Sequence, residues 1–222
     1  MAKIVILGSS GHGKVIIDIV QGEGKHEIAG LVDRYQPIGH QVFGFQVLGS
    51  EEDLPRLAKE HFLTGVIIAV GDNFLRSEVA TRVAGLCPEL RFVPSIHPQA
   101  TIGRDVSIGE GTVIMAGVIV NPSCSIGRFC ILNTASSLDH DSTMGDFSSL
   151  GPRAATAGRC HIGTHSAIGI GAVLIEDVTV GEHAIVGAGS TLLKNIAAFS
   201  VAYGSPAKEI RRRLPGDRYL RP

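Results

Sequence analysis

The chain has 222 residues and a mass of 23.3 kDa, and 20 Lys and Arg stand against 21 Asp and Glu, for a formal net charge of −1. Such balanced charge argues against electrostatic binding of nucleic acid, so we expect no nucleic-acid partner. Glycine is abundant, with 28 residues, whereas aromatic residues make up only 5%. This composition predicts a fold of short aliphatic side chains and frequent tight turns.

Neither a membrane span nor a secretory signal is expected. The longest nearly apolar stretch, residues 113–120, is too short to cross a bilayer. The first apolar run breaks into glycines before a signal-peptide core develops. The four cysteines have no CxxC spacing, so neither a zinc site nor a disulfide framework is predicted. We therefore expect a cytoplasmic protein without a structural metal.

A small α/β domain is predicted over residues 1–95. Short apolar runs and segments with helical periodicity alternate there, giving strands at 3–7, 28–32 and 65–71 and helices at 15–20, 51–60 and 74–86. Alternation of this kind predicts a parallel sheet with connecting helices.

The turn between the first strand and the first helix is rich in glycine. It reads GSSGHGK over residues 8–14, and backbone N–H groups in such a turn can hold a phosphate. Asp33, at the end of the second strand, is placed to accept hydrogen bonds from a ribose or a base. The glycine spacing is not the full dinucleotide fingerprint, so a purely structural tight turn is the alternative.

The strongest pattern is a six-residue repeat that runs from Ile96 to Leu192. Sixteen of the seventeen positions taken six residues apart are apolar, and the next residue is glycine nine times. Neither an α-helix nor an isolated strand has this period. A chain wound as a triangular prism, with one short strand on each face, does have it, and we expect about five coils.

The residue four positions after each apolar anchor is small or β-branched, and we expect it to lie inside the prism as well. Cys124, Cys130 and Cys160 all fall on this position. We interpret them as core residues rather than as redox or nucleophilic groups.

In one segment, residues 132–141 with the sequence LNTASSLDHD, the residue after each anchor is not glycine. His140 lies two residues past the anchor Leu138, on an outward turn, and Asp139 and Asp141 flank it. A neighbouring carboxylate can orient one ring nitrogen and stabilise the imidazolium formed when the other nitrogen takes a proton. His140 is therefore either a general base or a solvated corner residue.

Nearly the whole chain resembles one family. The motifs are ILGSSGHGKVI, LVDR, IAVGDN, the hexads, ILNTASSLDHD and YGSPAKEIRR. They resemble the hexapeptide-repeat sugar acetyltransferases, which include bacterial sialic-acid O-acetyltransferases and the N-acetyltransferases of nucleotide-linked 4-amino sugars. The resemblance implies a Rossmann-like domain over residues 1–95, a left-handed parallel β-helix over 96–200, and a tail over 201–222 that closes the CoA site.

The resemblance also implies site residues. The nucleotide sugar would be held by Ser10, Gly11, His12, Asp33, Arg34 and Gly71. Acetyl-CoA, the implied co-substrate, would be held by Ser149, Ile170 and Ala188. The implied catalytic residues are His140 as the general base, Asp141 as its orienting partner and Asn133 as a polar aid, with no metal. The chain departs from many relatives at two of these positions, because Arg34 replaces an acid and Ser149 replaces a histidine.

The C-terminal end is basic. It contains Arg211, Arg212, Arg213, Arg218 and Arg221. We interpret it as a solvated basic end rather than as a site for CoA phosphates or a membrane surface.

Our leading hypothesis is an acetyl-CoA-dependent N-acetyltransferase that acts on the amine of a nucleotide-linked, UDP- or GDP-, amino sugar in cell-surface glycan synthesis. The alternatives are O-acetylation of a sialic acid or related sugar, and a non-catalytic sugar-nucleotide-binding scaffold.

Four apolar residues fall outside the inward positions of the repeat, namely Met115, Ile119, Ile131 and Ile175. Outward apolar residues of this kind, together with the resemblance, predict a homotrimer with active sites between the chains.

Overall fold

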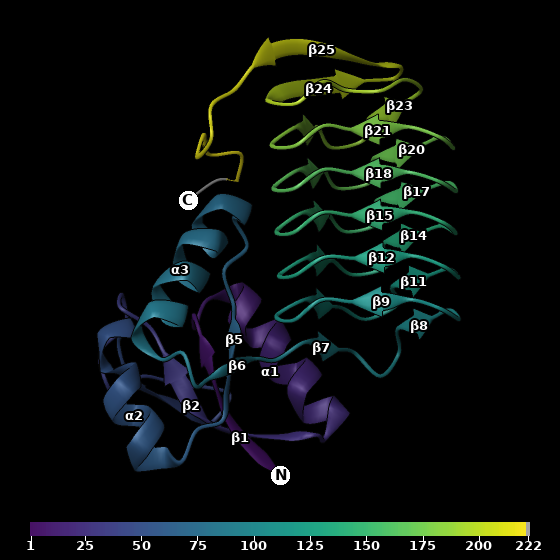
Figure 1. Ribbon diagram of the computed structural model, residues 1–222. Helices are drawn as coiled ribbons and strands as arrows, with labels where there is room; N and C mark the ends of the chain where they lie inside the picture. Colours follow the sequence, from purple (N-terminus) through teal and green to yellow (C-terminus); the bar gives the residue numbers. More distant parts are fainter. Residues whose placement is uncertain (221–222) are drawn as a thin grey trace. The chain divides into compact units, whose positions relative to one another are not determined.

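A computed structural model describes residues 1–220, and the chain forms two compact units (Figure 1). The first unit comprises Met1–Gly71 and Leu75–Pro98, and the second comprises Asp72–Phe74 and the chain from Gln99 onward. Across residues 1–220, no helix is both long enough and apolar enough to span a membrane.

The first unit is built on one sheet with the strand order β3-β4-β2-β1-β5-β6. Its strands are β1 (Ala2–Leu7), β2 (His26–Val32), β3 (Gln41–Val42), β4 (Phe45–Gly49), β5 (Gly65–Ile68) and β6 (Arg91–Phe92), and β7 (Ser95–Ile96) follows. Its helical segments are α1 (Gly11–Glu23), the short 3-10 helix η1 (Glu51–Asp53), α2 (Leu54–His61) and α3 (Asn73–Leu86), whose first two residues belong to the second unit. The neighbouring strands pair in parallel except β3 and β4.

The α/β prediction is confirmed, and the structure adds two details. The helix α1 begins at Gly11, inside the glycine-rich turn, rather than at residue 15. The antiparallel hairpin of β3 and β4 was not predicted. Phe43 and Gly44 at its tip both have positive φ, 50° and 83°. This backbone is typical of tight hairpin turns, but Phe-Gly is not one of the sequence pairs that usually mark them.

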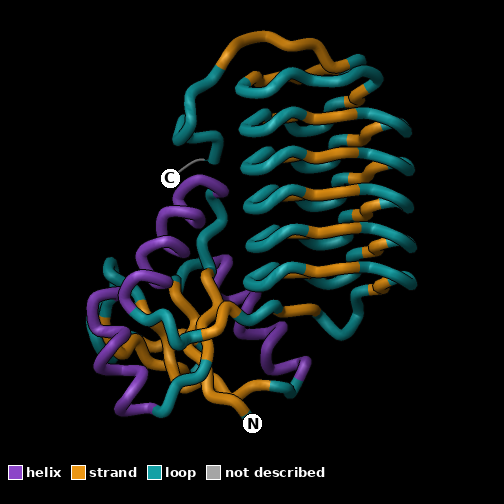
Figure 2. The backbone as a smooth tube through the Cα atoms, in the orientation of Figure 1, coloured by secondary structure: helices purple, strands orange, loops and turns teal. Residues whose placement is uncertain are grey.

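The second unit is a solenoid of short parallel strands stacked coil on coil in three faces (Figure 2). The first face consists of β8 (Thr101–Ile102), β11 (Ile119–Val120), β14 (Ser137–Leu138), β17 (Ala155–Thr156), β20 (Val173–Leu174) and β23 (Thr191–Leu192). The second face consists of β9 (Ser107–Ile108), β12 (Ser125–Ile126), β15 (Thr143–Met144), β18 (His161–Ile162) and β21 (Thr179–Val180).

The third face ends in a hairpin. It contains β10 (Val113–Ile114), β13 (Ile131–Leu132), β16 (Ser149–Leu150), β19 (Ala167–Ile168) and β22 (Ile185–Val186), followed by β24 (Ser200–Gly204) and β25 (Ala207–Arg212). Strands one coil apart pair in register at a step of 18 residues, as Val120 does with Leu138. The expected β-helix is confirmed, with three hexads to each coil.

The six-residue anchors fill the interior of the solenoid. All fourteen anchors from Ile114 to Leu192 are buried, whereas Ile96, Ile102 and Ile108 at the start are half-buried. Each buried aliphatic side chain removes apolar surface from water and stabilises the fold by about 1.5–3 kcal/mol before the entropy cost. Burial of the anchors therefore stabilises the solenoid along its length.

The three solenoid cysteines lie in this interior, as predicted. Cys124, Cys130 and Cys160 are each 1% exposed or less, and all are free thiols. Burial raises the pKa of the Cys124 and Cys160 thiols above the ordinary value, which disfavours the reactive thiolate.

Two expectations about the surface are wrong. Met115 and Ile131 are only 1% and 4% exposed within a single chain, whereas Ile119 and Ile175 are exposed as expected. The Thr134 hydroxyl, on the next coil, lies 3.8 Å from the Met115 sulfur and helps to cover it. Position in the hexad alone therefore does not decide whether a side chain faces water.

The basic end is also only partly solvated. Arg211, Arg212 and Arg218 are exposed, but Arg213 is 6% exposed and its guanidinium donates to the His183 carbonyl at 2.8 Å. Burial lowers the Arg213 pKa from its ordinary value. Arg213 is thus an anchor of the chain end on the solenoid. Arg221 lies outside the described residues.

Candidate active site

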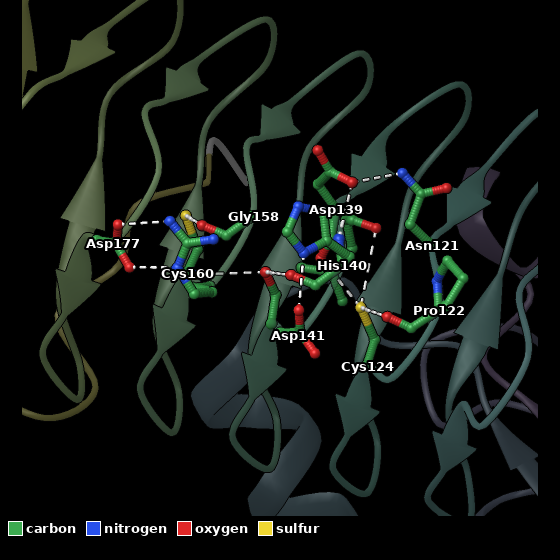
Figure 3. A network of polar contacts seen from close by, with 12 residues as sticks. Asn121, Pro122, Cys124, Asp139, His140, Asp141, Gly158, Cys160 and Asp177 are labelled. Atoms are coloured by element: carbon green, nitrogen blue, oxygen red, sulfur yellow. Dashed lines mark hydrogen bonds and ion pairs between the residues drawn. The ribbon is translucent and has the colours of Figure 1, made fainter.

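His140 lies on the turn that follows β14, where the first face of the solenoid meets the second (Figure 3). Its side chain is 47% exposed and that of Asp141 is 56% exposed. The pair is therefore open to a ligand in the single chain.

The backbone of this turn is fixed by the coils on either side. Asp141 donates its N–H to the Pro122 carbonyl at 3.2 Å, and Arg159 donates its N–H to the His140 carbonyl at 2.9 Å. Each of these bonds joins His140 or its neighbour to an adjacent coil. The turn can present a side chain outward without becoming loose.

Asp139 adds a second restraint on the turn. Its Oδ1 accepts the side-chain N–H of Asn121 at 2.5 Å and the backbone N–H of His140 at 2.8 Å. These hydrogen bonds, with that from Asn121 the stronger influence, hold the pKa of Asp139 below its ordinary value. Asp139 is therefore ionised at neutral pH and stiffens the backbone at His140.

The ring of His140 has a defined orientation. Its Nδ1 lies 2.8 Å from Oδ2 of Asp141. Because an ionised carboxylate only accepts hydrogen bonds, a neutral imidazole in this contact with such a carboxylate carries its proton on Nδ1 and keeps a lone pair on Nε2. The arrangement can abstract a proton at Nε2 and stabilise the resulting imidazolium.

Asn133 lies on a different corner, after β13 of the third face. Its Oδ1 accepts the backbone N–H of Thr134 at 2.8 Å. Across residues 1–220 of one chain, no hydrogen bond joins Asn133 to His140. The three residues that the resemblance groups as catalytic are thus a pair and a separate asparagine in the single chain.

Of the three residues expected to bind acetyl-CoA, two are exposed on turns and the third already has a protein partner. Ile170 and Ala188 are exposed and lie one coil apart on the turns after β19 and β22. Ser149 lies on β16, and its hydroxyl accepts the Nδ2–H of Asn73 at 3.1 Å. Asn73 itself is 1% exposed and also donates to the Ser166 carbonyl at 3.0 Å. The Ser149 hydroxyl thus already has a protein partner.

In the first unit, Asp33 fastens the glycine-rich turn to the end of β2. Its Oδ2 accepts both the backbone N–H of Ser9, at 2.9 Å, and the Ser9 hydroxyl, at 2.5 Å, while Oδ1 accepts the Tyr35 N–H at 2.8 Å. Partial burial opposes ionisation, but these hydrogen bonds outweigh it and lower the pKa of Asp33. Ser10 and Gly11 follow directly, at the start of α1.

His12 and Gly71 share one neighbour that the sequence did not reveal. Arg76 is 1% exposed, and its guanidinium donates to the carbonyls of Val70 and Gly71, each at 3.0 Å. The partly buried ring of His12 has its pKa lowered to about 4 by desolvation and, less strongly, by the charge of Arg76. His12 is therefore a neutral imidazole at physiological pH.

Arg34 does not stand alone either. Its guanidinium lies 3.3 Å from Glu51 Oε2 and 3.6 Å from Glu52 Oε1. The Glu51 side chain also accepts from Arg82 Nε at 2.8 Å. Arg34 thus belongs to an ion-pair network.

Sequence reasoning missed Asn121, Ser9, Arg76 and Glu51. For Asn121 a signal was available, since it stands 18 residues before Asp139, which is one coil. For the other three, no periodic signal exists, because their contacts join segments that follow no repeat. Within residues 1–220, no cluster of three or more His, Cys, Asp or Glu side chains is arranged to hold a metal ion.

Two families of known domains match the chain. The PglD N-terminal domain matches residues 3–83, and the bacterial transferase hexapeptide (six repeats) matches residues 159–194. The chain is also 34% identical over 118 residues to UDP-N-acetylbacillosamine N-acetyltransferase of Bacillus subtilis (strain 168). This match covers 52% of each protein, so it spans about half the length of that relative.

Solved structures match nearly the full chain. A histidine-to-asparagine variant of perosamine N-acetyltransferase from Caulobacter crescentus, in complex with CoA and GDP-perosamine, is 34% identical with a TM-score of 0.89, covering 95% of this chain and 98% of that one. A histidine-to-alanine variant has also been solved. The acetyltransferase domain of PglB from Neisseria gonorrhoeae, in complex with acetyl coenzyme A, is 31% identical with a TM-score of 0.85, covering 94% and 98%.

Proposed function

The chain belongs to the hexapeptide-repeat sugar acetyltransferase family, and we propose that it transfers the acetyl group of acetyl-CoA to the amine of a nucleotide-linked amino sugar. The product would enter cell-surface glycan synthesis. We propose the cytoplasm as the location of the reaction.

The observation that carries this proposal is the His140–Asp141 pair on a solenoid turn. In a chain so similar to N-acetyltransferases that bind CoA and GDP-perosamine, an outward histidine with an oriented Nδ1 is a group ready to take a proton. In two of the solved structures of perosamine N-acetyltransferase, one histidine is replaced by asparagine or by alanine. This supports assigning the proposed role to a histidine here.

The chemistry asked of the protein is modest, because the thioester of acetyl-CoA is already activated. The amine nitrogen attacks the acetyl carbonyl carbon, and His140 Nε2 takes the amine proton as the new C–N bond forms. The C–S bond then breaks, and the proton on Nε2 passes to the departing thiolate. Asp141 holds Nδ1–H and stabilises the imidazolium between the two steps.

We assign the first unit to the nucleotide sugar. The ends of β1, β2 and β5 carry the glycine-rich turn, Asp33 and Gly71, and ligands of open parallel sheets bind at such carboxyl ends. Ser10, Gly11 and neutral His12 would meet the phosphates, and Arg34 would lie beside the base. For acetyl-CoA we assign the turns at Ile170 and Ala188, with Ser149 contributing backbone contacts.

We further propose a homotrimer. The outward positions of the first face include Ile119 and Val173, which are 45% and 43% exposed, and this face leads into the turn of His140. Packing this face against a second copy would bury the apolar side chains and exclude water from the reacting groups. It would also allow Asn133 of one copy to approach His140 of another.

A free-thiol assay tests the function. Wild-type protein is mixed with acetyl-CoA and a panel of uridine-, guanosine- and thymidine-diphosphate amino sugars, together with free and cytidylylated sialic acids. We expect thiol release with at least one nucleotide amino sugar and an acetylated amine in the product. Turnover with sialic acids alone would make the chain an O-acetyltransferase, and binding without thiol release would make it a scaffold.

A further inference from the structure

Gly158 stands one coil beyond His140, at the equivalent corner of the solenoid (Figure 3). The 18-residue step gives Pro122, His140, Gly158 and Glu176 at this corner on successive coils. The imidazole of His140 occupies the space beside Gly158. A Cβ atom built on Gly158 would lie 2.5 Å from Cε1, 2.6 Å from Nε2 and 3.1 Å from Cδ2 of that ring.

This glycine differs from those that follow the hexad anchors. A Cβ on Gly109 would lie 2.5 Å from the backbone of Gly127, and one on Gly163 would lie 2.5 Å from the backbone nitrogen of Glu182. Those glycines are required because the next coil passes close to them. At Gly158 the three nearest atoms all belong to the His140 ring, which is the far end of a side chain rather than backbone.

The backbone does not require glycine at this position. Gly158 is not among the residues with positive φ, so an L-residue can adopt its conformation. Its carbonyl accepts the Asp177 N–H at 3.1 Å, a bond that any residue would keep. What the position lacks is only a side chain.

We infer that Gly158 is a positioning residue that leaves room for the His140 ring in its reactive orientation. This inference rests on the proposed role of His140. A methyl group at Gly158 pushes directly on Nε2, the atom that takes the proton, and on Cε1 beside it. The ring must then rotate away, which moves Nε2 from the amine and breaks the 2.8 Å contact between Nδ1 and Asp141.

The test is Gly158→Ala. Because misplacement of a reacting group by about 1 Å costs on the order of 10²-fold in rate, we expect kcat to fall by roughly 10- to 100-fold. We expect KM for both substrates to stay within about twofold, since uniform binding is not affected. The melting temperature should stay near that of wild type, because only a flexible side chain has to move. Unchanged kcat together with an unmoved His140 ring would overturn the inference.

Two controls separate positioning from a general structural effect. Gly85→Ala lies in α3, where an added Cβ meets nothing within 4 Å, and it should leave kcat unchanged. In a double-mutant cycle, Gly158→Ala should have almost no further effect once His140 is already alanine, because the clashing ring is gone. An equal loss of rate in both backgrounds would show that Gly158 does not act through His140.

A second readout does not depend on activity. The imidazole C–H resonances of His140 can be assigned by NMR through comparison with His140→Ala. Gly158→Ala should shift the His140 resonances and leave those of His161, on β18, in place. Unmoved His140 resonances would contradict the steric argument even if no acceptor is found. If the ring moves but kcat does not change, the proposed role of His140 as the general base is wrong instead.

Discussion

The side chains of His140 and Asp141 meet although the two residues are adjacent in the chain, with Nδ1 and Oδ2 2.8 Å apart. Asp141 has a φ of +57°, in the left-handed region. Aspartate tolerates this region better than most residues because its short polar side chain bonds locally. This left-handed turn thus places the carboxylate beside the ring that it orients.

Asp141→Asn should reduce kcat less than removal of His140 does. The exposed carboxamide can still present an oxygen to Nδ1–H, so the tautomer is kept while the charge that stabilises the imidazolium is lost. For a pair near the surface, this corresponds to roughly a tenfold fall in kcat. Steady-state kinetics with saturating acetyl-CoA measures it. A fall as large as that of His140→Ala would mean that Asp141 does more than orient and stabilise the ring.

Asp33→Ala should weaken binding of the nucleotide sugar. Without the carboxylate, Ser9 loses its partner for both its N–H and its hydroxyl, and the turn before α1 is released. We expect a higher KM for the acceptor and an unchanged Kd for acetyl-CoA, measured by kinetics and titration calorimetry. Asp18→Ala, an exposed acid on α1, is the matched control. Absence of nucleotide binding by the wild type would reduce the first unit to a structural role.

Folding stability should depend on His12 in mildly acid solution. The pKa of His12 is about 4 in the folded chain against 6.5 ordinarily, so the unfolded chain takes up the proton first. Stability is therefore complete above pH 6.5 and is lost as the pH falls toward 4, by up to about 3 kcal/mol. Urea unfolding at several pH values should show a smaller loss for His12→Gln. The exposed His40→Gln should keep the wild-type slope. Parallel slopes for wild type and His12→Gln would contradict the assignment.

The homotrimer predicts a defined mass in solution. Light scattering should give three times 23.3 kDa across dilution. Ile119→Arg, on the first face, should dissociate the assembly and lower kcat together. Ile38→Arg, at a residue that is 73% exposed in the first unit, should do neither. A stable and fully active monomer would exclude both the interface and a site shared between chains.

The solenoid could be predicted from the sequence because its order is local and periodic. Each anchor needs only the anchors one coil away, so a six-residue step is enough to place Leu138 inside and His140 outside. The same step, counted three hexads at a time, also relates Asn121 to Asp139 and His140 to Gly158. These relationships follow from the repeat. To find them, the coil length must be applied to the polar residues as well as to the apolar anchors.

Other features could not be predicted because they depend on contacts between segments that the sequence repeat does not relate. The burial of Arg213 requires the chain end to return to the solenoid at His183. The clasp between Ser9 and Asp33 joins two strand ends that only the folded sheet brings together. Met115 faces outward by its place in the hexad, yet the chain covers it. Burial at such positions is a property of tertiary packing rather than of the local pattern.

The central claim is that His140 takes the proton from the acceptor amine. Its most direct test is kcat of His140→Ala with the nucleotide amino sugar that gives turnover in the wild type, at saturating acetyl-CoA. Loss of a general base predicts a fall of about 10²- to 10⁴-fold, with the Kd for acetyl-CoA and the melting temperature unchanged. Wild-type turnover in a folded His140→Ala protein that still binds acetyl-CoA would contradict it.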